Sequence, residues 1–362
     1  MHRLAVWQLG RVEYADGLRL QKLFGDARAR DLVPDSLLLL EHPPVLTLGR
    51  GAKRKNIVAE AAQLSAQGVE VFETDRGGDV TYHGPGQVVG YPIFRLPPDR
   101  HDVRRYVRDL EEAMIRALRP FGIQAERVAK WPGVWISGKD GARPEKIGAI
   151  GVHLSRWQTS HGFALNVNTD LSHFGLIVPC GISDGGVTSM ERQLSRTVDI
   201  AAVERELARS FGEVFEGDVD MHRPAMRTIS VAVVRSEPSG ARILLLRRVP
   251  NRGAFWQIVT GRLEPGESPE RAAAREVLEE TGQQLTVVPL GYRHAFGFGD
   301  ELPPVVAEEE AFAALSLNAQ VRLDAAEHDA FCWLSLEEAM AKLPFEGLRR
   351  AVRLAARRQQ GV

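Results

Sequence analysis

The chain has 362 residues, of which 44% are hydrophobic and 26% are charged, and its formal net charge at pH 7 is −1. This composition is typical of a globular protein large enough for two or more domains, and the balanced charge argues against a nucleic-acid partner. The apolar runs are too short to cross a membrane. With only two cysteines and no secretory leader, the sequence predicts a cytoplasmic protein.

Predicted helices and short strands alternate over residues 1–216, which are expected to form the first domain. An amphipathic pattern predicts a helix over residues 16–31. Asp102 and Asp199 are suitable N-caps for two later helices, the second over residues 200–215. Strands are predicted over residues 37–40, 45–48, 69–73, 88–94, 133–137, 147–154 and 162–167.

Residues 217–224 are short, polar and turn-like, so they are expected to link the first domain to a second over residues 225–362. Beyond this link the pattern restarts with alternating strands over residues 228–234 and 242–246. The basic stretch at residues 349–360 carries an apolar stripe, which favours a solvated helix over a nucleic-acid patch.

Cys180 is the most informative single residue. The only other cysteine is Cys332, so no disulfide framework accounts for Cys180. Cys332 lies on a predicted strand beside Trp333 and is expected in the core. A thiol becomes a nucleophile when a cation stabilises the thiolate, and Lys146, in a glycine-rich segment, can supply that charge. The alternative for an isolated cysteine is a small buried hydrophobe.

Glycine-rich segments accompany this pair. Residues 76–87 contain four glycines and a proline together with Arg, Thr, Tyr and His, a mixture that favours close backbone approach to a ligand over a simple turn. Residues 146–151 and 161–168 are similar. His83 and His161 are either polar strand residues or groups that orient a substrate carbonyl, and no histidine pair in this half has zinc-like spacing.

Together these segments resemble the lipoyl(octanoyl) transferase family. The matching motifs are Arg-Gly-Gly at 76–78, Thr-Tyr-His-Gly-Pro-Gly-Gln at 81–87, Lys-Ile-Gly at 146–148, Gly151, His-Gly at 161–162, Ala-Leu-Asn at 164–166 and Pro-Cys-Gly-Ile at 179–182. The resemblance implies an α/β (α+β) fold of the biotin/lipoate-protein-ligase type, with a mixed sheet and an acyl tunnel.

The resemblance also implies that Cys180 carries the acyl group as a thioester and that Lys146 lowers its pKa. On the family pattern the substrate pocket is lined by Arg76, Gly77, Gly78, Asp79, Val80, Thr81, Tyr82, His83, Ala149, Ile150, Gly151, Gly162, Phe163 and Ala164. The implied donor is octanoyl-acyl carrier protein. The implied acceptors are the lipoyl domains of 2-oxoacid dehydrogenases and the glycine cleavage H protein.

Exchange between two thiols nearly conserves the thioester free energy, so the transfer needs no ATP or other cofactor. The acceptor lysine must lose a proton before it attacks, and Lys146 can act as the base once it is desolvated. Two alternatives stay open. One is an ATP-dependent lipoate ligase of the same fold, which would not need Cys180. The other is a non-catalytic module that binds acyl carriers or lipoyl domains.

A second motif lies in the other half, where Gly261 and Glu267 precede an acidic helix pattern. Glu276 and Glu280 are four residues apart and share a helix face, so their charges repel unless a cation compensates, and carboxylate ligands suit Mg²⁺ or Mn²⁺. The alternative is a solvated acidic helix face, which the fixed glycines at 261 and 282 disfavour.

This pattern resembles the Nudix box at every position except the last, where Gln283 replaces an apolar residue. The resemblance implies an α/β/α sandwich that hydrolyses a diphosphate linked to another moiety. Residues 255–261 and 326–334 resemble segments of dihydroneopterin triphosphate pyrophosphatases. By that match Glu276, Glu280 and Glu327 bind the metal, and Arg247 and Thr260 contact a nucleoside or pterin triphosphate. A nucleotide sensor without turnover is the alternative.

Overall fold

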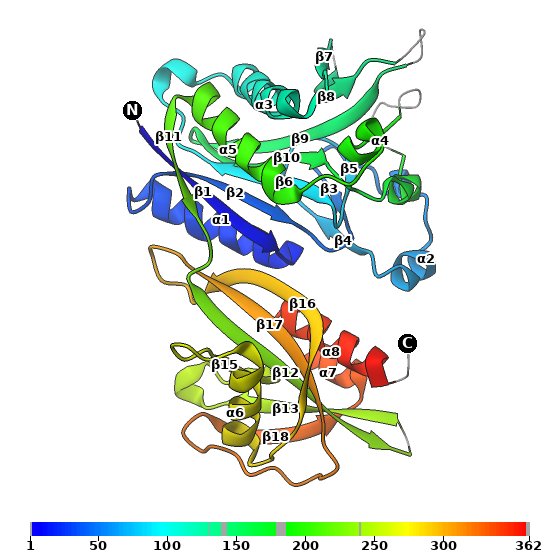
Figure 1. The fold of residues 1–362 in the computed structure, drawn as a ribbon, viewed down its shortest axis with the longest axis vertical. Helices are drawn as coiled ribbons and strands as arrows, with labels where there is room; N and C mark the ends of the chain where they lie inside the picture. Colours follow the sequence, from blue (N-terminus) through cyan, green and yellow to red (C-terminus); the bar gives the residue numbers. More distant parts are fainter. Residues whose placement is uncertain (1, 130, 139–142, 179–185, 239, 360–362) are drawn as a thin grey trace. The chain divides into compact units, whose positions relative to one another are not determined.

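The computed structural model describes residues 2–129, 131–138, 143–178, 186–238 and 240–359. The chain forms two compact units (Figure 1). Unit 1 comprises Met1–Arg223 with Gly299–Pro304, and unit 2 comprises Pro224–Phe298 with Val305–Val362. No helix in the described ranges is both long and apolar enough to span a bilayer.

Unit 1 is built on an eight-stranded mixed sheet of order β11-β1-β2-β6-β10-β9-β8-β7. Its strands are β1 (His2–Arg11), β2 (Asp35–Glu41), β6 (Gln87–Ile93), β7 (Glu126–Val128), β8 (Trp131–Ile136), β9 (Glu145–Ser155), β10 (Gln158–Asn166) and β11 (Gly217–His222). β1 is parallel to β2 and β11, and the other neighbours are antiparallel. A smaller sheet joins β3 (Val45–Leu48), β4 (Glu70–Glu73) and β5 (Val80–His83).

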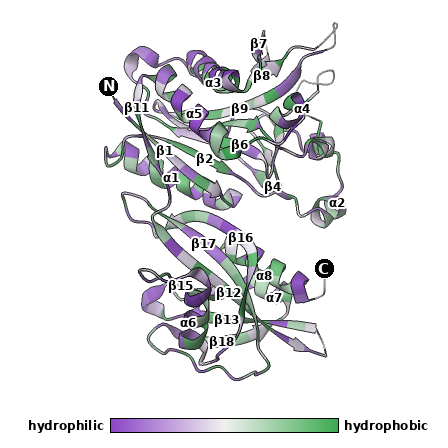
Figure 2. Cartoon of the chain, in the orientation of Figure 1, coloured by the Kyte–Doolittle hydropathy of each residue, from purple (hydrophilic) through white to green (hydrophobic). Residues whose placement is uncertain are grey.

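The helices of unit 1 are α1 (Tyr14–Ala29), α2 (Ala61–Ala66), α3 (Val103–Leu118), α4 (Met190–Leu194) and α5 (Ile200–Phe215). The predicted N-caps are confirmed, since Asp102 accepts from the backbone of Arg104 and Arg105, and Asp199 accepts from Ala201. Along α3 and α5 hydrophilic and hydrophobic residues alternate, as expected of helices with one buried face (Figure 2).

Strand alternation divides the sheet of unit 1 into two faces. Val88 of β6 and Leu165 of β10 belong to the core cluster that includes α3 and α5, where Phe211 stacks on Phe163. The intervening residues of the same strands, such as Val89 and Ala164, line a cavity instead. The two-residue period therefore directs most side chains of these strands either to the core or to the candidate site, and Phe163 contributes to both.

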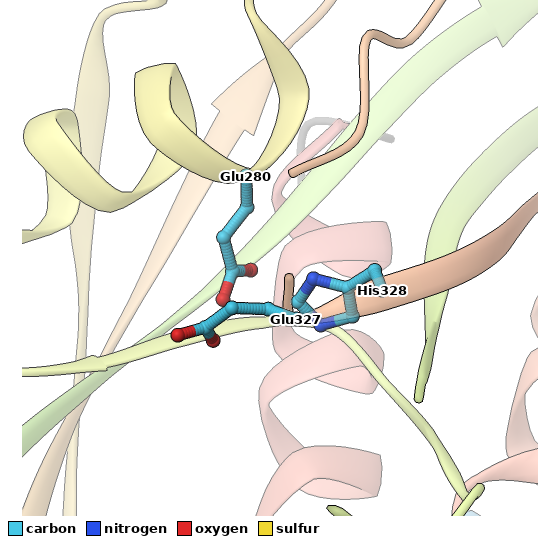
Figure 3. Close-up of side chains that lie close together, drawn as sticks. All are labelled: Glu280, Glu327 and His328. Atoms are coloured by element: carbon cyan, nitrogen blue, oxygen red, sulfur yellow. The ribbon is translucent and has the colours of Figure 1, made fainter. Parts of the chain in front are cut away.

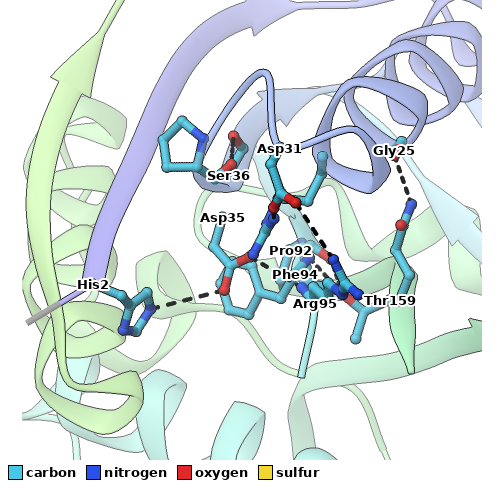
Figure 4. A network of polar contacts seen from close by, with 12 residues as sticks. His2, Gly25, Asp31, Asp35, Ser36, Pro92, Phe94, Arg95 and Thr159 are labelled. Carbon is cyan, nitrogen blue, oxygen red and sulfur yellow. Dashed lines mark hydrogen bonds and ion pairs between the residues drawn. The ribbon is translucent and has the colours of Figure 1, made fainter. Parts of the chain in front are cut away.

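A polar network holds α1 against the strands that carry the cavity (Figure 4). Gln158 Nε2 donates to the Gly25 carbonyl of α1 at 2.9 Å, and Asp35 accepts from the Arg95 backbone N–H at 3.0 Å. Thr159 Oγ1 donates to the Pro92 carbonyl at 2.6 Å. These bonds fix the ends of β2, β6 and β10 relative to one another.

Residues 217–222, expected to be part of a turn-like linker, form strand β11 instead. This segment pairs in parallel with β1 over the register from His2–Gly217 to Trp7–His222. Val219 packs against the core cluster and alternates with the acidic residues Asp218 and Asp220, so the segment has the two-residue period of an edge strand. A partner 215 residues away in sequence could not be recognised from the local pattern.

Glu204 of α5 is a buried carboxyl near this edge of the sheet. It is 6% exposed and accepts a hydrogen bond from Gln8 Nε2 of β1 at 2.8 Å. Burial raises the pKa of Glu204 to about 7, although the hydrogen bond from Gln8 opposes this shift.

Unit 2 has a seven-stranded sheet of order β14-β13-β12-β17-β16, with β15 paired to β12 and β18 paired to β13. Its elements are β12 (Met226–Glu237), β13 (Gly240–Arg248), β14 (Trp256–Gln257), β15 (Val259–Arg262), α6 (Pro269–Thr281), β16 (Val287–Phe298), β17 (Val305–Leu315), β18 (His328–Leu334), α7 (Leu336–Lys342) and α8 (Glu346–Gln359).

Helices cover both faces of this sheet, which confirms the expected α/β/α sandwich. Val231 and Val233 of β12 pack in the cluster that contains Val277 of α6. The alternate residues Ala232 and Val234 pack in the cluster that contains α7 and α8. The basic C-terminal stretch is accordingly an amphipathic helix with a buried apolar stripe.

Candidate functional site

The face of the unit 1 sheet opposite α3 and α5 lines a cavity of about 350 Å³, which we call the acyl cavity after the acyl tunnel that the family resemblance implies. Of the residues expected in the substrate pocket, all except Gly77 and Tyr82 line it. Lys146, Tyr14, Tyr91, Trp131 and Phe174 complete much of the wall. The glycines are needed here: a Cβ on Gly162 would lie 2.1 Å from the Gly90 carbonyl oxygen, so β6 and β10 could not approach as they do.

Tyr82 lies on the other side of β5. Its side chain is 1% exposed, belongs to the small cluster with Leu46 and stacks on His173 at 4.9 Å between ring centroids. Residues 74–79, between β4 and β5, form a segment that we call the glycine loop. Gly77 donates its backbone N–H to the Val152 carbonyl at 2.9 Å, which fixes this loop to β9. Both residues therefore lie behind the residues that line the acyl cavity.

Arg76 mainly holds the glycine loop closed. Its guanidinium is 7% exposed and donates to the Thr47 carbonyl at 2.6 Å and to the Asp79 carbonyl at 2.7 Å. These bonds join β3 to the loop, so the arginine shapes the cavity through the backbone.

His83 presents a neutral acceptor in the cavity wall. Gln87 Nε2 donates to Asn166 Oδ1 at 2.9 Å and to the Tyr82 carbonyl at 3.2 Å, so Gln87 Oε1 is left to accept from His83 Nδ1–H at 2.7 Å. The lone pair of His83 is then on Nε2. Burial lowers the pKa of His83 to about 3, so the ring stays neutral.

Tyr91 is tied to a second buried histidine. His42 is fully buried, and its Nδ1–H donates to the Val12 carbonyl at 2.7 Å, which leaves Nε2 to accept from the Tyr91 hydroxyl at 2.7 Å. Burial lowers the pKa of His42 to about 4 and raises that of Tyr91 well above its usual value. The sequence analysis missed Tyr91, although it follows the same alternation as Val89.

His161 is paired with Asp75. Its Nε2 lies 2.7 Å from Asp75 Oδ1, and its backbone has φ of +55°, in the left-handed region. Burial lowers the pKa of His161, while Asp75 opposes this shift. His161 lines the cavity beside Gly162.

Lys146 lies at the start of β9 and lines the acyl cavity, with Nζ 4.6 Å from the centroid of the Trp135 ring. Its backbone N–H donates to the Gly186 carbonyl and its carbonyl accepts from Thr188. Cys180 lies outside the described residues. On either side of the undescribed 179–185, Phe174 and Val187 line the same cavity.

Unit 2 gathers three potential metal ligands, Glu280, Glu327 and His328, with ligand atoms within 4.8 Å of one another (Figure 3). Glu280 is 2% exposed, and neither of its carboxylate oxygens has a hydrogen-bond partner of normal geometry. Burial, followed by the charges of Glu276 and Glu327, raises its pKa well above the usual value, against the opposing effects of Arg248 and the Thr260 backbone. A buried carboxylate without partners fits a site for a cation.

His328 was missed by the sequence analysis, although it directly follows Glu327. It is 1% exposed, and its Nδ1 has no partner. Its Nε2 lies 3.4 Å from the side-chain amide of Gln257, which also contacts Thr260 Oγ1 at 3.0 Å. Gln257 Nε2 donates to Thr260 Oγ1 and faces His328 Nε2, so Nδ1 is the ring nitrogen of His328 that has no neighbouring polar partner among the described residues.

Glu276, also expected to bind the metal, is not part of this group of ligand atoms. Glu276 pairs with Arg275 at 2.8 Å and packs against Gly261, where a Cβ would lie 2.0 Å from its carboxyl carbon. Glu327 accepts from Arg248 at 2.6 Å and from Arg252 at 2.9 Å.

Of the two expected substrate contacts, Thr260 lies on β15, beside Gln257. Arg247 pairs with Asp329 at 2.7 Å, and its guanidinium carbon is 5.9 Å from the Trp256 ring centroid. The two residues thus lie on separate strands, and only Thr260 contacts a neighbour of the metal-ligand group.

Comparison with known proteins gives a family for each half. Residues 13–212 match the lipoyl protein ligase A/B catalytic domain, and residues 226–354 match the NUDIX domain. An octanoyltransferase of Myxococcus xanthus is 58% identical over 356 residues, which cover 98% of this chain and 99% of the relative. An octanoyltransferase of Koribacter versatilis is 51% identical over 218 residues, which cover 60% of this chain and 86% of the relative.

Similar solved structures include a bi-partite lipoate protein ligase from Thermoplasma acidophilum, 18% identical with a TM-score of 0.49, covering 61% of this chain and 88% of that one. Another is the E. coli dihydroneopterin triphosphate pyrophosphohydrolase, 27% identical with a TM-score of 0.32, covering 36% and 95%.

Proposed function

The chain belongs to the octanoyltransferases and carries a Nudix domain, and we propose that unit 1 transfers octanoyl groups through a thioester on Cys180. The donor is octanoyl-acyl carrier protein. The acceptors are lysines of the lipoyl domains of 2-oxoacid dehydrogenases and of the glycine cleavage H protein. The thiolate of Cys180 attacks the donor thioester and releases the carrier thiol, and the acceptor amine then displaces Cys180 to form an amide.

The observation that carries this proposal is that Lys146 lines the acyl cavity together with Phe174 and Val187, the described cavity residues on either side of Cys180 in sequence. A cation at this position stabilises the thiolate before acylation. The Lys146 ammonium donates its proton to the carrier thiolate as it leaves. In the second step the neutral Lys146 amine accepts a proton from the incoming ammonium, and neutral His83 Nε2 accepts a hydrogen bond from the acceptor amine.

Mass spectrometry after mixing the protein with octanoyl-acyl carrier protein tests the thioester. Wild type should gain one octanoyl group that hydroxylamine removes, and Cys180→Ser should gain none. An unmodified thiol during steady turnover would contradict the proposal.

Two lysine variants separate charge from basicity. Lys146→Ala should raise the pH at which Cys180 is alkylated. Lys146→Arg should keep thiolate reactivity better than it keeps transfer, because guanidinium cannot act as a base. Identical alkylation profiles in wild type and Lys146→Ala would remove the role of this lysine in thiol activation.

For unit 2 we propose hydrolysis of a nucleoside or pterin triphosphate that depends on Mg²⁺ or Mn²⁺, with Glu280, Glu327 and His328 holding the ion. A bound divalent ion neutralises diphosphate charge and activates water. Support comes from the unpartnered oxygens of Glu280 and the unpartnered Nδ1 of His328. Arg248 and Arg252, which contact Glu327, carry the positive charge available to substrate phosphates.

A panel of nucleoside and pterin triphosphates, assayed for pyrophosphate release with each metal, tests this proposal. Glu280→Ala should lower the rate by about 10³-fold or more, because it deletes a ligand, while exposed Glu270→Ala should not. Equal turnover in EDTA would contradict a metal-dependent mechanism.

A further inference from the structure

A strongly basic segment borders the acyl cavity of unit 1. Arg50, Lys53, Arg54 and Lys55, which we call the basic rim, are all exposed. None of the four side chains has an ion pair or hydrogen bond among the described residues. Residues 47–59 contain no Asp or Glu, so the four charges are not balanced within the segment. Such a patch attracts an acidic partner over a distance of about 10 Å at moderate salt.

The basic rim is fixed to the wall of the cavity by its backbone. Arg50 N–H donates to the Arg76 carbonyl at 2.9 Å, and Gly51 N–H donates to the Gly78 carbonyl at 3.0 Å. Gly49 fits so closely that a Cβ there would lie 2.5 Å from the Gly78 carbonyl oxygen. A molecule bound to the rim is therefore held at a set distance from the cavity.

Two exposed apolar side chains lie next to the rim. Val58 is 55% exposed and Val178 is 46% exposed. Their segments are hydrogen-bonded, since Val58 N–H donates to the Leu176 carbonyl at 3.0 Å and Val178 N–H donates to the Asn56 carbonyl at 2.7 Å. Cations around a small apolar centre are typical of a surface that docks an acidic, partly apolar protein face.

We propose that the basic rim, with Val58 and Val178, docks the acyl donor, a carrier protein with an acidic face around its prosthetic arm. This inference rests on the proposed function of unit 1. Both donor and acceptor must reach Cys180, but their reacting groups differ in charge. The acceptor presents a lysine ammonium, which four cations repel, whereas the donor arm carries a phosphodiester, which they attract.

Charge reversal with separate donors tests this inference. Lys53→Glu, Arg54→Glu and Lys55→Glu are combined in the full chain, and kcat/KM is measured with three donors. These are octanoyl-acyl carrier protein, octanoyl-coenzyme A, and octanoyl-N-acetylcysteamine, which lacks both protein and phosphate. In the triple variant, kcat/KM with octanoyl-acyl carrier protein should fall about 100-fold and lose most of its salt dependence. With octanoyl-N-acetylcysteamine, kcat/KM should change by less than about threefold.

A matched variant controls for net charge. Arg104, Arg105 and Arg108 are exposed on α3, which contributes no residue to the acyl cavity. Reversing these three arginines makes the same change in net charge and should leave all three donors unaffected. The KM for the acceptor domain should stay the same in both triple variants.

Three results would overturn the docking surface. Equal losses with all three donors would place the rim in the catalytic pocket. An equal loss with coenzyme A and carrier protein would mean that only phosphate is recognised, and no loss with carrier protein would mean that it docks elsewhere. The proposed function is judged separately by wild-type transfer from the small thioester. If that transfer fails, fluorescence anisotropy of labelled carrier protein still measures docking, and the rim variant must bind more weakly.

Discussion

The acyl cavity of unit 1 and the metal-ligand group of unit 2 both contain buried polar side chains, but the hydrogen bonds of these side chains are completed in different ways. In unit 1, His42 and His83 each have one ring nitrogen committed to a neighbouring carbonyl or amide, and both rings are neutral. In unit 2, Glu280 and His328 keep buried atoms without partners.

This difference indicates whether each site needs a bound ligand to satisfy its buried polar groups. A buried polar group without a partner costs free energy, so a site that keeps several such groups is stabilised by the ion it binds. A site whose histidines are already paired can receive an uncharged acyl chain without further compensation. The following predictions test the contrast, beginning with the largest effect.

If the two sites are independent, a substitution in one site should abolish only the activity of that site. Cys180→Ser should lower octanoyl transfer by about 10³-fold or more and spare triphosphate hydrolysis, and Glu280→Ala should do the reverse. Both variants are assayed for both reactions, with folding checked by circular dichroism. Loss of transfer in the folded glutamate variant would mean that the two units work as one coupled enzyme.

Removing a polar group from the completed network should destabilise the protein. Gln87→Leu leaves His83 Nδ1 and Asn166 Oδ1 unpaired, and the free energy of unfolding should fall by about 3 kcal/mol. Chemical denaturation measures the change. The exposed Gln63→Leu serves as control and should stay within about 0.5 kcal/mol of wild type. A similarly small effect of Gln87→Leu would show that the network is dispensable.

The nitrogen ligand of unit 2 can be seen directly with Mn²⁺. His328→Asn should weaken Mn²⁺ binding by about 10- to 100-fold and abolish the imidazole-nitrogen coupling in pulsed electron paramagnetic resonance of the bound ion. His101→Asn, in unit 1, should change neither quantity. A wild-type spectrum without nitrogen coupling would exclude His328 as a ligand.

Removing the charge of Glu280 should raise the free energy of unfolding of the metal-free protein, whereas the substitution of Gln87 should lower it. Glu280→Gln should raise the metal-free unfolding free energy by about 1–2 kcal/mol, because it removes a buried carboxylate without a partner. Added Mn²⁺ should then stabilise the variant much less than wild type. Calorimetry with EDTA and with Mn²⁺ gives both values, and the exposed Glu270→Gln is the control. Destabilisation of the metal-free variant would contradict the assigned role.

Glu204 gives a smaller, pH-dependent effect in unit 1. Because its folded pKa is raised to about 7, its favourable contribution is complete below about pH 4.5 and is lost as the pH rises through 7. Glu204→Gln should therefore be more stable than wild type at pH 8 by about 1 kcal/mol and nearly equal to it at pH 5. Thermal melts at both values test this, and a difference independent of pH would refute it.

Much of the fold could be predicted from local pattern. The helix over Ile200–Phe215 and the strand Val45–Leu48 have the predicted bounds, because caps and apolar periodicity act over a few residues. β11 could not be found this way, since its partner β1 lies at the other end of unit 1. His328 and Tyr91 were missed for a related reason, because only the folded sheet shows which neighbours they meet.

The pairing of β11 with β1 sets an order of events during synthesis. His2 leaves the ribosome 215 residues before its partner Gly217, so one edge of β1 stays open while the rest of unit 1 is made. At about 5–20 residues per second this interval is about 10–40 s. An open strand edge can pair with another nascent chain, so chaperone capture or slow translation over these residues should matter most for this strand. A version of the gene split between its two halves would have to keep codons 217–222 with the first.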